Sequence, residues 1–244
     1  MGIPAQFNDI IQKHLNVFAA WIPIVNKYSL GDYGIFSDGV FAKLGNITDD
    51  FQVTFTPGTG STASIDFSSE GASVIKFSGD TEVQVIPAGD VKARIEIKFS
   101  NEKSFLVKSP TITVATIENI NAVAQKLKAT GKWDGQWKVV SAVYNAEDAV
   151  VVSTIKSGTT LNFSGDASAL GEMKLGQAGV SIDTNQALGL NISGKTGVIG
   201  LGLFRIKTNI FGGSKVEIMA EDGLLGKDDK IAIPLKGGSV NDDL

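Results

Sequence analysis

The clearest pattern in the chain is a two-residue alternation of apolar and polar positions between Phe51 and Lys108. Such alternation sends neighbouring side chains to opposite faces of a sheet. It is most regular near residue 95, where the two sets of positions are Val91, Ala93, Ile95, Ile97 and Phe99 on one face, and Lys92, Arg94, Glu96 and Lys98 on the other. The pattern predicts a meander of antiparallel strands, in which the segment Val91–Phe99 is one strand.

Two shorter alternating segments, Phe51–Phe55 and Ala63–Phe67, flank the sequence Pro57-Gly-Thr-Gly60. Proline presets φ and glycine tolerates positive φ, so this sequence is typical of a tight reversal. We therefore expect a hairpin, with Val53, Phe55, Ile65 and Phe67 on its apolar face. Further strands are predicted at Val74–Phe77 and Glu82–Ile86.

The first twenty residues show a helical pattern instead. Between Pro4 and Ala20, apolar positions and one histidine recur at spacings of three and four: Phe7, Ile10, Ile11, His14, Leu15 and Phe18. Pro4 suits a first helical turn and Pro23 suits the end of the helix, and the segment Ala19–Val25, which contains Trp21, extends the apolar character beyond it. This amphipathic helix is predicted to pack on the sheet, and membrane or partner docking is the alternative.

The later part of the chain predicts one more helix and a second set of strands. The helix is expected over residues 116–131, with Thr116 as its cap and Gly131 as its end. The strands are expected at Tyr33–Phe36, Val40–Leu44, Trp137–Tyr144, Ala149–Ile155, Thr159–Phe163, Val198–Lys207 and Ser214–Met219. Turns are predicted at Ser37–Gly39 and Asn145–Asp148.

Together these elements predict an α+β fold that is predominantly β. We expect a twisted antiparallel sheet of meandering hairpins, an amphipathic N-terminal helix and one mid-chain helix. At 244 residues the chain is expected to form a single β-rich domain. Its parts are the helix and apolar extension (1–27), the meander (28–108), the helix (116–131), the second strand set (133–220) and a tail (221–244), which contains the apolar piece Ile231–Leu235.

The composition narrows the chemistry. The chain has 43% hydrophobic and 20% charged residues, a formal net charge of −4, one histidine and no cysteine. A general nucleic-acid binder needs clustered Lys and Arg, so nucleic acid is not an expected partner. The lack of cysteine excludes disulfides and thiolate metal sites, and one histidine cannot build a multi-histidine zinc site. No metal and no cofactor are therefore predicted.

The sequence also lacks the usual signs of catalysis. A Ser-His-Asp or Cys-His enzyme needs a histidine beside its nucleophile, but His14 lies in an apolar helical stripe and is interpreted as structural. The run Pro57–Thr62 resembles a phosphate loop but has no lysine and precedes no predicted helix. A carboxylate pair assembled in space would leave no trace in the spacing, so a glycosidase remains an alternative. We expect a non-catalytic protein.

No secretory signal and no transmembrane segment of about 18 to 20 apolar residues is visible in the sequence. The chain is therefore expected to be made as a soluble protein. It would be cytoplasmic or released, and membrane-associated when active.

These features favour a soluble protein that inserts conditionally into membranes, as a pore-forming or membrane-perturbing effector or toxin. Membrane lipid is its expected partner, and the active form is expected to be a homo-oligomer. A non-catalytic structural or binding module, which self-assembles or docks a protein, is the alternative. The residues predicted to contact membrane or partner are Phe7, Ile11, Leu15, Phe18, Trp21, Val53, Phe55, Ile65 and Phe67.

The layout resembles the pore-forming amino-terminal domain of gasdermins. The resemblance rests on the helix at residues 3–20, the strand series from Tyr33 to Phe99, and three later runs: Trp137-Lys-Val-Val, Val150-Val-Val-Ser and Leu201-Gly-Leu-Phe-Arg-Ile206. In that family an amphipathic first helix accompanies extended hairpins that rearrange into a membrane pore. The resemblance implies the same activity for this chain.

Overall fold

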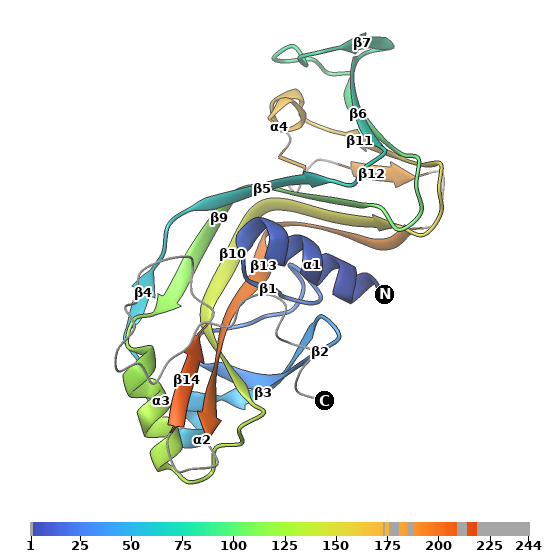
Figure 1. Ribbon diagram of the computed structural model, residues 1–244. Coiled ribbons are helices and arrows are strands. Elements are labelled where there is room, and N and C mark those ends of the chain that lie inside the picture. Colours follow the sequence, from blue (N-terminus) through green and yellow to red (C-terminus); the bar gives the residue numbers. More distant parts are fainter. Residues whose placement is uncertain (1, 173, 176–180, 185–187, 209–213, 219–244) are drawn as a thin grey trace.

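The computed structural model describes residues 2–172, 174–175, 181–184, 188–208 and 214–218 (Figure 1). Within these ranges the protein is mostly β, with antiparallel sheets, an N-terminal helix and further short helices, which confirms the predicted fold class. The helices are α1 (Ile3–Leu15), α2 (Ile47–Phe51), α3 (Ile120–Ala129) and α4 (Ala167–Gly171).

The larger sheet, sheet A, is built around three long strands that curve together along the molecule (Figure 1). Its strands are β1 (Phe18–Ala19), β2 (Asp32–Ser37), β3 (Val40–Asn46), β4 (Pro57–Thr59), β5 (Ala63–Ser68), β9 (Phe105–Ile117), β10 (Lys138–Thr154), β13 (Leu188–Thr208) and β14 (Ser214–Ile218). In its middle the order is β5-β9-β10-β13, and every pair is antiparallel.

The smaller sheet, sheet B, lies at one end of sheet A, and β6 and β7 project beyond the rest of the molecule (Figure 1). Its strands are β6 (Ala72–Ser78), β7 (Thr81–Val83), β8 (Ala93–Phe99), β11 (Thr159–Ser164) and β12 (Ser181–Thr184). Their order is β12-β11-β8-β6-β7.

The described residues form four apolar clusters, and two of them lie on opposite faces of the long strands. On one side Phe7 and Ile11 of α1 pack against Phe105, Val107 and Val151. On the other side the long strands cover sheet B, and the side chains in this contact are Leu106, Val150 and Val152 of sheet A with Ile95, Ile97, Phe99, Leu161 and Phe163 of sheet B. The outer halves of β9 and β10 are therefore buried on both faces.

The hairpin expected over residues 51–67 is wrong. Phe51 ends helix α2, whose first turn is capped by the Asn46 side chain accepting a hydrogen bond from the Thr48 N–H at 2.9 Å. Beyond it, β4 and β5 lie one after the other along the same strand, β9, instead of pairing with each other. The Pro57 sequence does not reverse the chain, because residues 57–59 pair with β9, and proline is tolerated on an edge strand.

The turn expected at Asn145–Asp148 is also wrong, because β10 runs through it as one strand of 17 residues. Asn145 pairs with Thr113 on one side and with Val198 on the other. Two long neighbours supply partners across the polar run, so the pairing outweighs the local turn tendency. The positive φ of Asp148, 48°, marks only a local irregularity.

The first helix is shorter than predicted. It ends at Leu15, where Asn16 takes a left-handed conformation with φ 55° and donates its N–H to the Gln12 carbonyl. Phe18 lies in β1, opposite Leu201 of β13, and so is not on the helix. An asparagine that tolerates positive φ ends this helix before Pro23 is reached.

Other expected elements are found with shifted bounds. The reversal between β2 and β3 has positive φ at Asp38 and Gly39, as a two-residue hairpin requires. Helix α3 ends before Gly131, which has φ 65°, but it begins at Ile120, because Thr116 belongs to β9. The piece Ile231–Leu235 lies outside the described residues.

Candidate functional site

The structure places the nine predicted contact residues inside the protein or partly covered. Phe7, Ile11, Phe18, Val53 and Ile65 are buried, and Leu15, Trp21, Phe55 and Phe67 are half-buried. Contact of these side chains with lipid therefore stays a proposal that requires them to leave their present neighbours. The only histidine, His14, is exposed and lies against Phe67, with ring centroids 5.0 Å apart.

The most informative feature is that both sheets have the same strand order. In sheet A the order is β5-β9-β10-β13, and in sheet B it is β6-β8-β11-β12. Each strand of one sheet continues along the chain into the corresponding strand of the other: β5 into β6, β8 into β9, β10 into β11, and β12 into β13. We call each such pair of consecutive strands a path. The two sheets thus consist of the same four paths, which bend sharply where sheet A meets sheet B.

The central pair of paths keeps a single register through the bend. In sheet A Phe105 lies opposite Ser153, and in sheet B Phe99 lies opposite Thr159. Six residues separate these pairs on both paths, so neither path has gained or lost a residue relative to the other. The bend can open between these two paths without changing their pairing.

At the bend, three residues have positive φ and polar groups form hydrogen bonds between the paths. Gly71, Lys103 and Gly158, one on each of three paths, have positive φ of 81°, 54° and 72°. Hydrogen bonds then fasten the paths: the Asn101 amide donates to the Glu70 carbonyl at 3.1 Å, and the Ser104 N–H donates to the Thr154 hydroxyl at 3.1 Å. The network is local and polar, unlike the apolar cores on either side of it.

Strand β8 confirms most of the predicted alternation. Ala93, Ile95, Ile97 and Phe99 are buried, whereas Arg94 and Glu96 are half-buried and Lys98 is exposed. Val91 is the exception, because its side chain is 94% exposed in the turn before β8. Val85, in the same connection between β7 and β8, is 74% exposed.

The connection between β7 and β8 is therefore an apolar tip at the projecting end of sheet B. Val85 and Val91 face solvent, while Ile86 is buried against the core under sheet B. Single exposed apolar side chains are normal on soluble proteins. Val85 and Val91 are, however, two largely exposed apolar side chains on one projecting connection, and moving them from water into lipid would be favourable.

An aromatic cluster lies at the opposite end of the molecule. Tyr33, Phe51, Trp133 and Trp137 pack together, with ring centroids 5.0 to 6.2 Å apart. Burial raises the pKa of the Tyr33 hydroxyl above its ordinary value of 10.0. These rings fill the space between them, so the cluster is a packed core edge.

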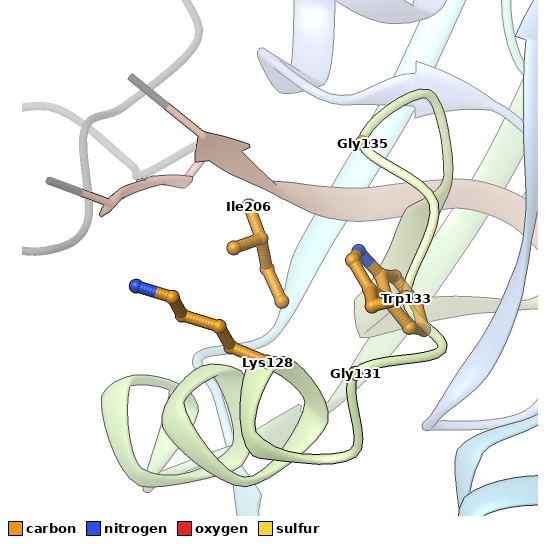
Figure 2. A pocket seen from close by; sticks show the side chains of 5 residues that line it. All are labelled: Lys128, Gly131, Trp133, Gly135 and Ile206. Carbon is orange, nitrogen blue, oxygen red and sulfur yellow. The ribbon is translucent and has the colours of Figure 1, made fainter. Parts of the chain in front are cut away.

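Figure 2 shows a pocket of about 250 Å³ beside this cluster, between α3 and β13. Lys128, Gly131, Trp133, Gly135 and Ile206 line it. The indole nitrogen of Trp133 is buried and makes no hydrogen bond in the structure. The lining of the pocket is mainly apolar, and the exposed Lys128 extends alongside Ile206 (Figure 2).

Neither a metal site nor a helical membrane span is found in the described part of the chain. Among those residues no group of three or more His, Cys, Asp or Glu side chains is placed to hold a metal ion. None of the described helices is long and apolar enough to cross a membrane.

Comparison with known proteins gives resemblances to solved structures, among them two gasdermin structures. No family model and no curated protein matches the sequence. A bacterial gasdermin from Bradyrhizobium tropiciagri is similar over 95% of both chains, at 14% identity and a TM-score of 0.36. The gasdermin A3 membrane pore, seen by cryo-EM, covers 91% of this chain and 96% of its own, at 10% identity and a TM-score of 0.35.

These findings confirm the predicted resemblance to gasdermins at the level of outline. At such TM-scores the likeness is too distant to assign an activity. The shared strand order, the bend and the exposed tip are the features of this chain on which a functional argument can rest. Sequence reasoning found the alternation of β8 but missed the bend, since pairing between distant segments leaves no local signal.

Proposed function

We propose that the protein inserts into membranes and assembles there into a pore lined by antiparallel strands. The observation that carries the proposal is that four paths run in the same order through both sheets. Opening the bend would convert two packed sheets into one set of four long strands, without any change in which strands are neighbours. The protein would act physically, by permeabilising a bilayer, and no catalytic group would be needed.

The lengths and faces of the strands suit a bilayer. A membrane-spanning strand needs about 9 to 11 residues, with apolar side chains on the lipid side and polar ones on the water side. Strand β8 already has this alternation, and its charged face carries Arg94, Glu96 and Lys98. In the structure β9 and β10 cover the apolar face of β8. The side chains that would contact lipid in the pore are therefore buried before insertion.

The two outer strands of the four supply a route to self-assembly. On the outer side of β5, and of β13 from Leu188 to Ser193, no described strand pairs, whereas at Val198 and Ile199 the N–H groups of Ile24 and Ala20 already donate to β13 and would have to leave it. The two strands run in opposite directions, so β13 of one copy beside β5 of the next would make an antiparallel pair. Such a contact joins different surfaces and closes into a ring when the rotation between copies allows it.

Dye release from vesicles, run beside size-exclusion chromatography, tests the proposal. Phosphatidylcholine vesicles with and without phosphatidylglycerol should leak when the protein is added, and ring-like oligomers should be recovered from the membrane fraction. A stable soluble filament or complex without any leakage would replace the pore with the structural or binding module. That alternative would use the same outer edges of β5 and β13 without a membrane.

A further inference from the structure

In the structure, β6 pairs with β8 in a register that places the larger apolar side chains of β6 on the charged face of sheet B. We call this pairing the stored register. Directly opposite residues of an antiparallel pair point to the same face. Ile75 lies opposite Glu96, and Phe77 lies opposite Arg94, whose guanidinium carbon is 4.2 Å from the phenyl centroid. Lys76 correspondingly lies opposite Ile95, on the face that holds the core.

The neighbouring part of the same path has a different register. In sheet A, Ser68 of β5 lies opposite Leu106 of β9, whereas in sheet B Ala72 lies opposite Phe99. Ser68 and Ala72 are four residues apart, whereas Phe99 and Leu106 are seven residues apart. The register therefore changes by three residues at the bend. A shift by an odd number of residues moves every side chain of a strand to the other face.

If the register of β5 and β9 continued outward, the faces would become consistent. From one opposite pair to the next toward the tip, the residue number rises by one on the β5–β6 path and falls by one on the β8–β9 path. Ile75 would then lie opposite Phe99, and Phe77 opposite Ile97. The apolar face would consist of Ile75, Phe77, Thr81, Val83 and Val85 on one strand and Val91, Ala93, Ile95, Ile97 and Phe99 on the other, with Gly79 between them.

The other face of the same hairpin would be polar throughout, and it would gain ion pairs. Asp80 would lie opposite Arg94, and Glu82 opposite Lys92, whereas Glu82 now lies opposite Phe77 in the small β6–β7 ladder. One like-charged pair, Lys76 opposite Lys98, would oppose the change. Lys98 already has a partner in Glu96, at 2.8 Å, which moderates that repulsion.

We propose that β6 and β8 slide by three residues relative to each other when the bend opens, so that residues 75–99 take up the register of β5 and β9. The inference rests on the proposed function and adds the register that this hairpin has in the lipid. Segment 75–85 has eleven residues and segment 91–99 has nine, which matches the length that a bilayer requires. The exposed Val85 and Val91 lead this hairpin into the bilayer.

The stored register is explained by what covers sheet B in water. There, Ile95, Ile97 and Phe99 are fully or almost fully buried under Leu106, Val150 and Val152, and Ile86 anchors the tip to the same core. That burial holds the hairpin although Ile75 and Phe77 remain only half-buried. In the proposed pore the apolar face would meet lipid and the charged face would meet water, so the balance reverses there.

A labelling experiment tests the faces. Gln84, Val85, Val91 and Lys92 are all exposed, and the chain has no cysteine, so a single cysteine at each site takes an environment-sensitive dye without touching the core. On phosphatidylcholine–phosphatidylglycerol vesicles, the dye at Val85 or Val91 should shift to the blue and be quenched by lipid-borne quenchers. The dye at Gln84 or Lys92 should stay in water.

Charge reversal tests the register itself. Glu82 and Lys92 are exposed in the stored form, so E82K and K92E should leave the soluble fold unchanged. Each single change should slow dye release about two- to fivefold, the range expected for one cross-strand ion pair. The double variant E82K/K92E should recover most of the parent rate.

A reversible lock gives the complementary result. The disulfide F77C/R94C joins residues that are opposite in the stored register. When oxidised it should abolish dye release, and a reductant should restore it. The disulfide S37C/V40C, across the opposite pair that closes the β2–β3 hairpin, is the matched control and should leave dye release unchanged.

The outcomes separate the inference from the function beneath it. Leakage by the parent protein together with equal responses at adjacent tip residues would overturn the hairpin and leave the pore intact. Leakage that survives the F77C/R94C lock, or single charge reversals that the double variant does not repair, would overturn the register change. If no vesicle leaks and no dye responds, both the proposed function and this inference are wrong.

Discussion

The Phe7 ring of α1 stacks on the Phe105 ring of β9, with centroids 6.4 Å apart and planes inclined by 26°. Both side chains are at most 2% exposed, so this contact ties the first helix to the long strands. Replacing a buried phenylalanine by alanine leaves a cavity and removes its transfer free energy. Phe7→Ala should therefore lower the free energy of unfolding by about 3 to 5 kcal/mol.

Urea denaturation followed by tryptophan fluorescence would measure this loss. Lys13→Ala, on the exposed side of the same helix, is the control and should change the stability by less than about 0.5 kcal/mol. A Phe7→Ala variant as stable as the control would mean that α1 does not pack on β9 in solution.

Gly34 of β2 is expected to be intolerant of any side chain. A Cβ atom there would lie 2.0 Å from the Ala42 carbonyl oxygen, which belongs to the backbone of the paired strand β3 and cannot turn away. Gly34→Ala should cost about 3 kcal/mol, in the range of overpacked cores. Thermal unfolding would show the loss.

Gly171→Ala is the matched control, since a Cβ at Gly171 would meet no atom within 4 Å. This substitution should leave the melting temperature close to that of the parent. Equal effects at both glycines would contradict the close approach of β2 and β3.

The pH dependence of the tip follows from Asp90. A hydrogen bond from Ser78, and one from the Lys92 N–H at 2.8 Å, lower the pKa of this carboxyl below its ordinary value of 3.8. A lowered pKa in the folded state means that the carboxylate stabilises the tip above pH 3.8 and loses that effect only as the pH falls through the lowered value. The tip should therefore keep its conformation between pH 7 and pH 5.

The emission of a dye at Val91, titrated in solution without vesicles, would report this behaviour. We expect a transition only below pH 3.8 in the parent and none from this group in Asp90→Asn. A transition near pH 5 or 6 that disappears in Asp90→Asn would show instead that acid releases the tip.

Hydrogen exchange should distinguish one long β10 from two strands joined by a turn. Residues 145–147 pair with β9 on one side and β13 on the other, so their amides should exchange as slowly as those of neighbouring β10 residues. Mass spectrometry of a peptide covering this segment would measure the rate. The exposed segment 155–157, just beyond the end of β10, supplies the fast-exchanging reference.

The sequence predicted which residues share a face within a strand better than it predicted where strands pair. Alternation identified the buried positions of β8 because that signal lies within a few neighbouring residues. The polar run at Asn145 and the Pro57 sequence both favour turns locally, yet both lie in extended chain because β9, β10 and β13 are long enough to pair across them. The length of a strand is decided by its partners.

Phe18 illustrates a second limit. Its spacing from Leu15 and Ile11 fits a helix, but Asn16 ends the helix and Phe18 pairs with Leu201, almost two hundred residues away. The offset between β6 and β8 is hidden for the same reason. A period of two fixes which side chains share a face of one strand, but not how far one strand slides along the next.

The registers of the β5–β9 and β6–β8 pairs differ by three residues, and this difference also has a kinetic consequence. All seven pairs between β6 and β8, from Ala72 to Ser78, have to separate before the shifted pairs can form. This step takes place within one molecule, so its rate should not depend on protein concentration, whereas the later joining of copies should. On vesicles the protein would then show a lag of fixed length even when its concentration is high.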